Sequence, residues 1–158
     1  MAIKGLSEGV KGYCLVKSLE EFDKILVNVI DKTLRYSLGD RTVKIFYDYL
    51  RRKGFDMSNI PRNPDFFFDE LRKVLEFEGS RFHSVSALGI VSLLERAIIE
   101  VLCKKFGVKF DENGPIIFSE WVEKLREAGS LKFSKLKVLE QAEVKNVDGK
   151  GERVDSGR

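Results

Sequence analysis

The most apolar stretch of this chain is residues 84–106, with the sequence SVSALGIVSLLERAIIEVLCKKF. One set of its apolar residues recurs at intervals of three and four, as on one side of a helix: Leu88, Val91, Leu94, Ile98, Val101 and Leu102. A second set, Ile90, Leu93, Ala97 and Ile99, fills most of the remaining surface. Such a helix is typical of the centre of a bundle or of a subunit contact. We therefore expect a long central helix that ends at Gly107.

Four shorter amphipathic segments accompany this helix along the chain. Ser18 and Glu21 have the capping-box spacing, which predicts a helix from there to about Tyr36. A second helix is expected over residues 41–53, with Asp40 as its N-cap and Gly54 after its end. A third is expected to begin at Asn63-Pro64-Asp65, and a last one to extend from Gly114-Pro115 to Gly129. The pattern predicts an all-α bundle of about five helices.

The ends of the chain have a different composition from its middle. Residues 1–17 contain three glycines and mixed polarity, which indicates a loose arm with at most one short strand. Residues 141–158 are rich in charge and glycine, which favours a disordered tail. We thus expect one helical domain over residues 18–140, with a flexible arm before it and a flexible tail after it.

The overall composition is that of a globular protein with a highly charged surface. Charged residues make up 34 % of the 158 residues, and Gln141 is the only glutamine, a bias typical of proteins from hot environments. The N-terminus lacks the apolar core of a signal peptide, and no uncharged run approaches the roughly 20 residues of a membrane span. These features predict a cytoplasmic protein without membrane contact.

The residue types that carry most catalytic and metal chemistry are scarce. His83 is the only histidine, and no nucleophile motif accompanies it, so we interpret it as a surface or helix-entry imidazole. Cys14 and Cys103 lack a second ligand at zinc spacing and are expected to be small buried residues, although a disulfide between them stays open. Phosphate-binding glycine motifs are missing. We therefore expect no catalytic residues, no metal site and no cofactor.

A basic segment follows the first expected helix. Its cations are Arg35, Arg41, Lys44, Arg51, Arg52 and Lys53, opposed by Asp40 and Asp48. Tyrosines lie among them, and such a surface could contact nucleic-acid phosphates. The simpler alternative is a solvated face with cations at the C-terminal end of a helix, where the helix dipole favours them.

Two apolar features point instead to protein partners. Leu94 and Ile98 in the long helix could form a dimer seam, and Phe66 or Phe68 could present a ring to another protein. The alternative is complete burial inside the monomer. Our favoured hypothesis is a non-enzymatic interaction or regulatory module that could form a homodimer through the long helix. The alternative hypothesis is nucleic-acid binding through the basic segment.

Several short motifs add a family resemblance over about residues 31–107. Three motifs resemble motifs that occur in the same order in the archaeal helical output domains named after Nitrosopumilus. They are the run Leu34-Arg35-Tyr36-Ser37-Leu38-Gly39-Asp40, the loop Ile60-Pro61-Arg62-Asn63-Pro64-Asp65-Phe66, and Leu94-Glu95-Arg96-Ala97-Ile98-Ile99 with Phe106-Gly107. The chain departs from that pattern through the insertion at residues 78–86 and an additional helix afterwards. The resemblance implies an all-helical module associated with archaeal signal transduction, without catalytic residues.

Overall fold

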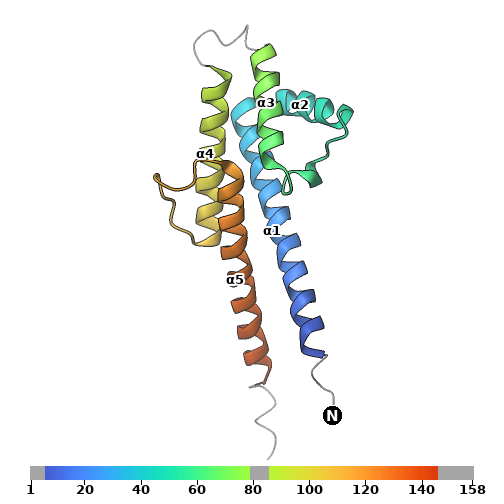
Figure 1. The fold of residues 1–158 in the computed structure, drawn as a ribbon, viewed down its shortest axis with the longest axis vertical. Helices are drawn as coiled ribbons and strands as arrows, with labels where there is room; N and C mark the ends of the chain where they lie inside the picture. Colours follow the sequence, from blue (N-terminus) through green and yellow to red (C-terminus); the bar gives the residue numbers. More distant parts are fainter. Residues whose placement is uncertain (1–5, 79–85, 146–158) are drawn as a thin grey trace, which may run out of the picture.

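The computed structural model describes residues 6–78 and 86–145 of the chain. These residues form α1 (Leu6–Leu38), α2 (Asp40–Arg52), the 3-10 turn η1 (Met57–Asn59), α3 (Pro64–Glu78), α4 (Ala87–Phe106) and α5 (Phe118–Lys145). The described part contains no strand, so the predicted all-α bundle is confirmed (Figure 1). None of its helices combines the length and apolarity needed to cross a membrane.

The helix at the centre of the bundle is α1, which packs against α2, η1, α4 and α5 (Figure 1). Its buried residues Phe22, Leu26, Ile30 and Leu34 follow one another at intervals of four and form a continuous ridge. The expectation that residues 84–106 are the central helix is therefore wrong. α4 buries one side only, because no described element covers the side that carries Leu93.

The first helix begins at Leu6, twelve residues before the expected start at Ser18. The expected loose arm over residues 1–17 is thus wrong for residues 6–17, and residues 1–5 lie outside the described part. The four-residue spacing of the α1 ridge extends backwards in the sequence through Ser18, Cys14, Val10 and Leu6. Gly9 and Gly12 each lower helix propensity by about 1 kcal/mol, a preference too weak to end α1.

The last helix does not end at Gly129 but continues to Lys145. Gly129 is buried, and a Cβ atom there would lie 3.2 Å from a ring carbon of Phe106 and 3.3 Å from one of Phe22. Gly129 therefore permits close packing of α5 against α1 and α4 and does not end the helix. Residues 141–145 belong to this helix, so the expected tail begins too early; residues 146–158 lie outside the described part.

The helix ends agree with the sequence at most positions. Gly54 and Gly107 take positive φ values of 76° and 68° after α2 and α4, as expected. Asn63 accepts a hydrogen bond from the backbone N–H of Phe66 at the start of α3. Asp40 is not an N-cap: it is the first residue of α2, and its carboxylate accepts a hydrogen bond from Arg35 instead (2.8 Å).

The core joins the helices through a chain of aromatic rings. Phe67 of α3 lies between Phe46 of α2 and Phe68, with ring centroids 5.2 Å away in both directions. Phe68 in turn makes an edge contact with Phe118 of α5 at 4.6 Å. These contacts fix α2, α3 and α5 to one another. Cys103 is a buried free thiol in the same core, as expected for a small apolar residue, and its burial raises its pKa.

Candidate interaction surfaces

The long apolar helix, α4, presents two different sides. Val91, Leu94, Ile98, Leu102 and Phe106 are buried against α1, α3 and α5. Leu93, Ala97 and Val101 lie on the opposite side at intervals of four residues, and we call them the outer face of α4. Leu93 is 67 % exposed and Val101 is 39 % exposed. The small side chain of Ala97 at the middle of this face would let another helix approach closely.

Three of the four residues expected to meet a partner are used inside the monomer. Leu94, Ile98 and Phe68 are buried, so of the two alternatives, partner contact or burial inside the monomer, the structure shows burial for these three. Phe66 is half-buried and packs against Phe55 of the α2–α3 loop, with 5.1 Å between ring centroids. The neighbouring residue Leu93 is the exposed one, because one residue along a helix rotates the side chain by about 100°.

Charged residues run along one edge of the outer face. Arg96 donates from Nε to Glu100 (3.0 Å) and from a terminal guanidinium nitrogen to Glu112 in the α4–α5 loop (2.8 Å). Its guanidinium also lies over the ring of Phe110 at 5.4 Å. The edge therefore has one cation and one anion, a single turn apart on the helix.

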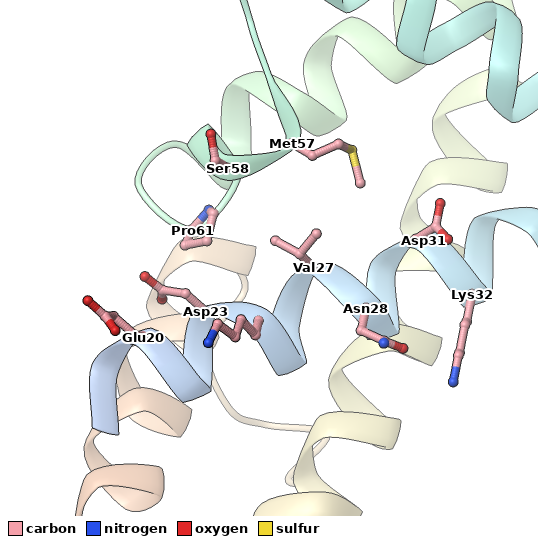
Figure 2. A pocket seen from close by; sticks show the side chains of 10 residues that line it. Glu20, Asp23, Val27, Asn28, Asp31, Lys32, Met57, Ser58 and Pro61 are labelled. Carbon is pink, nitrogen blue, oxygen red and sulfur yellow. The ribbon is translucent and has the colours of Figure 1, made fainter. Parts of the chain in front are cut away.

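A groove of about 660 Å³ lies between α1 and η1 (Figure 2). Its apolar lining comes from Val27, Met57 and Pro61. Two of its carboxylates already have partners in the fold. Asp23 accepts a hydrogen bond from Arg126 of α5 (3.1 Å), and Asp31 accepts from Arg35 and from Tyr47. The contacts with Arg126 and Tyr47 hold α1 against α5 and α2, and Glu20, Asn28 and Lys32 also line the groove.

The six cations of the basic segment fall into two groups. Arg35 is held by Asp31 and Asp40, Arg51 by Asp48, and Lys53 by Glu70, at 2.6–3.1 Å. Arg41, Lys44 and Arg52 are exposed, and no carboxylate in the described residues forms an ion pair with them. The surface available to an external anion is therefore the outer side of α2 that carries these three residues, with Asp48 among them.

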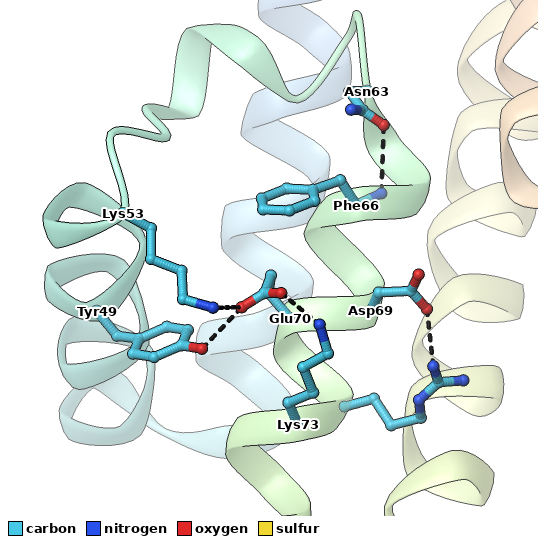
Figure 3. Close-up of polar contacts among 8 residues, drawn as sticks. Tyr49, Lys53, Asn63, Phe66, Asp69, Glu70 and Lys73 are labelled. Carbon is cyan, nitrogen blue, oxygen red and sulfur yellow. Dashed lines mark hydrogen bonds and ion pairs between the residues drawn. The ribbon is translucent and has the colours of Figure 1, made fainter.

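A buried carboxylate joins α2 to α3 (Figure 3). Glu70 is only 2 % exposed at its side chain, and its Oε2 accepts hydrogen bonds from Lys53 (2.6 Å) and from the hydroxyl of Tyr49 (2.7 Å). Its Oε1 accepts a third from Lys73 (2.7 Å). Hydrogen bonds from the two ammonium groups lower the pKa of Glu70 to about 2. The lowered pKa keeps the carboxylate ionised at neutral pH, so the cluster is an ionic anchor between α2 and α3.

The sequence did not reveal either the outer face of α4 or the Glu70 cluster. The four-residue spacing of Leu93, Ala97 and Val101 is visible in the sequence, but nothing there says which side of an apolar helix its neighbours cover. In the sequence, Glu70 looks like its charged neighbours in α3, and only the packing of α2 against α3 shows that it is buried. His83 lies outside the described residues.

Comparisons with protein-family models, with curated proteins and with solved structures gave no match. The resemblance of residues 31–107 to archaeal helical output domains therefore stays a prediction.

Proposed function

We propose that this chain is a non-enzymatic interaction module that associates with a second copy of itself through the outer face of α4. The observation that carries the proposal is the exposure of Leu93, Ala97 and Val101 on one side of a helix whose other side is fully used in the core. Exposed apolar side chains are common when scattered singly, but three at helical spacing form a helix-packing surface.

The arrangement of the face fits a two-fold axis beside Ala97. Leu93 and Val101 each lie four residues from Ala97, on either side of it. In an antiparallel pair of α4 helices, Leu93 of one copy would therefore meet Val101 of the second copy, and the two Ala97 residues would face each other. A closed pair of this kind uses the same surface on both subunits, as most homodimers do.

The charged edge supports the same arrangement. This two-fold axis places the edge with Arg96 and Glu100 beside the same edge of the second copy, running in the opposite direction. Arg96 lies one residue before Ala97 and Glu100 three residues after it, so Arg96 of one copy comes within about 3 Å along the axis of Glu100 of the other. Opposite charges then lie side by side. Because α4 has 20 residues and is about 30 Å long, the contact is small, and we expect the association to be weak and reversible.

Cysteine cross-linking tests this geometry. Ala97→Cys is expected to give a disulfide-linked dimer under mild oxidation, because a two-fold axis brings equivalent atoms together at its centre and disulfides need Cα atoms within about 7 Å. Ser92→Cys is the control: Ser92 is exposed on the same helix but on another side. The measurement is the fraction of dimer on a non-reducing gel. Equal cross-linking of both variants, or none with Ala97→Cys, would contradict the proposed axis.

The second candidate function is nucleic-acid binding by the outer side of α2. What favours it is the set of three exposed cations without an acidic partner in the described chain, namely Arg41, Lys44 and Arg52. Three phosphate contacts predict an affinity that falls about 40-fold between 50 and 200 mM salt. Fluorescence anisotropy with single-stranded and duplex oligonucleotides measures this.

Charge reversal separates this surface from general electrostatics. The pair of changes Arg41→Glu and Lys44→Glu should abolish the salt-dependent binding, whereas Lys109→Glu in the α4–α5 loop should lower it less than threefold, since Lys109 is an exposed lysine on a different element. If the loop variant has the larger effect, or if affinity does not change with salt, α2 is not a nucleic-acid surface.

A further inference from the structure

The end of the bundle where α1 begins and α5 ends has an uncovered apolar row. We call residues 6–17 of α1 and 131–145 of α5 the α1–α5 extension, because both helices run past the last residue of α4 there (Figure 1). Resting on the proposed role as an interaction module, we infer that the extension is the docking site for an acidic amphipathic helix of another protein, which contacts Leu136 and Leu139.

The argument begins with one side of α5. Leu125, Gly129, Phe133 and Leu136 follow at intervals of four, four and three residues, so they share one side of the helix. Leu125 and Gly129 are buried and Phe133 is half-buried, but Leu136 is 50 % exposed. Leu139 continues the row and is 63 % exposed. The side that forms the core in the first half of α5 therefore reaches solvent in the second half.

The end of α4 explains this change. Phe106 is the last residue of α4, and its ring lies against the position of Gly129. Gly107 then turns the chain away with a φ of 68°. Leu136 and Leu139 come two to three helical turns after Gly129, beyond the reach of α4. A helix placed in line with α4 would cover them, as Phe106 of α4 packs against Gly129.

The net positive charge of the α1–α5 extension favours an acidic helix as the binding partner. Residues 131–145 contain four lysines and two glutamates, and residues 6–17 contain two lysines and one glutamate. Lys132 and Lys135 are exposed, and the ammonium of Lys132 donates to the carbonyl of Lys105 at the end of α4 (2.9 Å). Lys104 and Lys105 add two more positive charges at that end. A second copy would bring this positive surface against itself, whereas an acidic helix would be attracted to it.

Two synthetic peptides of about 18 residues test the inference with the full chain. Both carry leucines at helical spacing, and their other positions are mainly glutamate in one peptide and mainly lysine in the other. Fluorescence anisotropy should show at least tenfold tighter binding of the acidic peptide. Leu136→Glu and, separately, Leu139→Glu should weaken that binding at least tenfold while the helix signal in circular dichroism is unchanged.

Val138→Glu is the matched control, because it introduces the same charge at an exposed residue that lies about 160° around α5 from Leu136 and about 100° from Leu139. It should change the affinity less than threefold. Equal binding of both peptides, or unchanged binding by the Leu136 and Leu139 variants, would overturn the inference. So would loss of self-association in Leu136→Glu, which would identify a second copy as the occupant. The α4 dimer is tested by changes at Ala97, so either proposal can fail without the other.

Discussion

Replacement of Phe67 by alanine is expected to lower the free energy of unfolding by about 3–5 kcal/mol. Phe67 is fully buried, and its ring makes edge contacts with Phe46 of α2 and Phe68 of α3. Its removal leaves a cavity at the junction of these helices and takes away two aromatic contacts worth about 0.5–1.5 kcal/mol each. A loss of this size is a large part of the stability of a small domain. Urea denaturation at neutral pH measures it.

The same helix provides the control for this change. Phe77 of α3 is 91 % exposed, so Phe77→Ala removes an identical side chain without opening a cavity. We expect its free energy of unfolding to stay within about 0.5 kcal/mol of the parent value. A loss at Phe67 no larger than that at Phe77 would show that the aromatic chain does not hold α2, α3 and α5 together.

The second large effect is expected at Glu70. Glu70→Gln should lower the free energy of unfolding at pH 7 by about 1–3 kcal/mol, because a neutral amide replaces a buried carboxylate that accepts three hydrogen bonds, two of them from ammonium groups. The figure stays in this range because Lys53 and Lys73 are partly exposed and water can solvate them after the change. The control is Asp48→Asn, which removes an exposed ion pair with Arg51 and should cost less than about 0.5 kcal/mol.

The effect of Glu70 should depend on pH in one direction. The pKa of its carboxyl is about 2 in the folded chain and near the ordinary 4.5 in the unfolded chain. A lowered pKa stabilises the fold fully above pH 4.5, and this contribution is lost as the pH falls toward 2. The difference in stability between the parent protein and Glu70→Gln should therefore be largest at neutral pH and smaller at pH 3. A difference that grows with acid would contradict the assigned anchor.

Most of the fold could be predicted from the sequence, because the helices carry strong periodic and capping signals. Gly54, Asn63 and Gly107 mark helix ends at the expected positions. The errors fell on glycines, whose meaning depends on tertiary packing. Gly9 and Gly12 indicated a loose arm, and Gly129 indicated a helix end, yet all three lie inside helices. A glycine that ends a helix and one that admits a neighbouring ring look identical in a single sequence.

The surfaces were less predictable than the fold. The apolar character of residues 84–106 was evident, and so was the choice between core and partner contact. In the structure one helix has both kinds of residue. Leu94 and Ile98 belong to the core, whereas Leu93, Ala97 and Val101 face outward. The basic segment also divides into paired and unpaired cations. The Asp31–Arg35 pair lies within α1, four residues apart, but Lys53 is neutralised by Glu70 of α3, a contact that only the packing of α2 against α3 creates.

Sedimentation equilibrium of the full chain and its Ala97→Glu variant tests the central claim most directly. Ala97→Glu puts two carboxylates face to face on the proposed two-fold axis, where like charges repel, but leaves the core untouched. The parent chain is expected to sediment as a mixture of monomer and dimer at tens of micromolar, Ala97→Glu as a monomer, and Ser92→Glu like the parent. A parent chain that stays monomeric at these concentrations, or a dimer that survives Ala97→Glu unchanged, would contradict association through the outer face of α4.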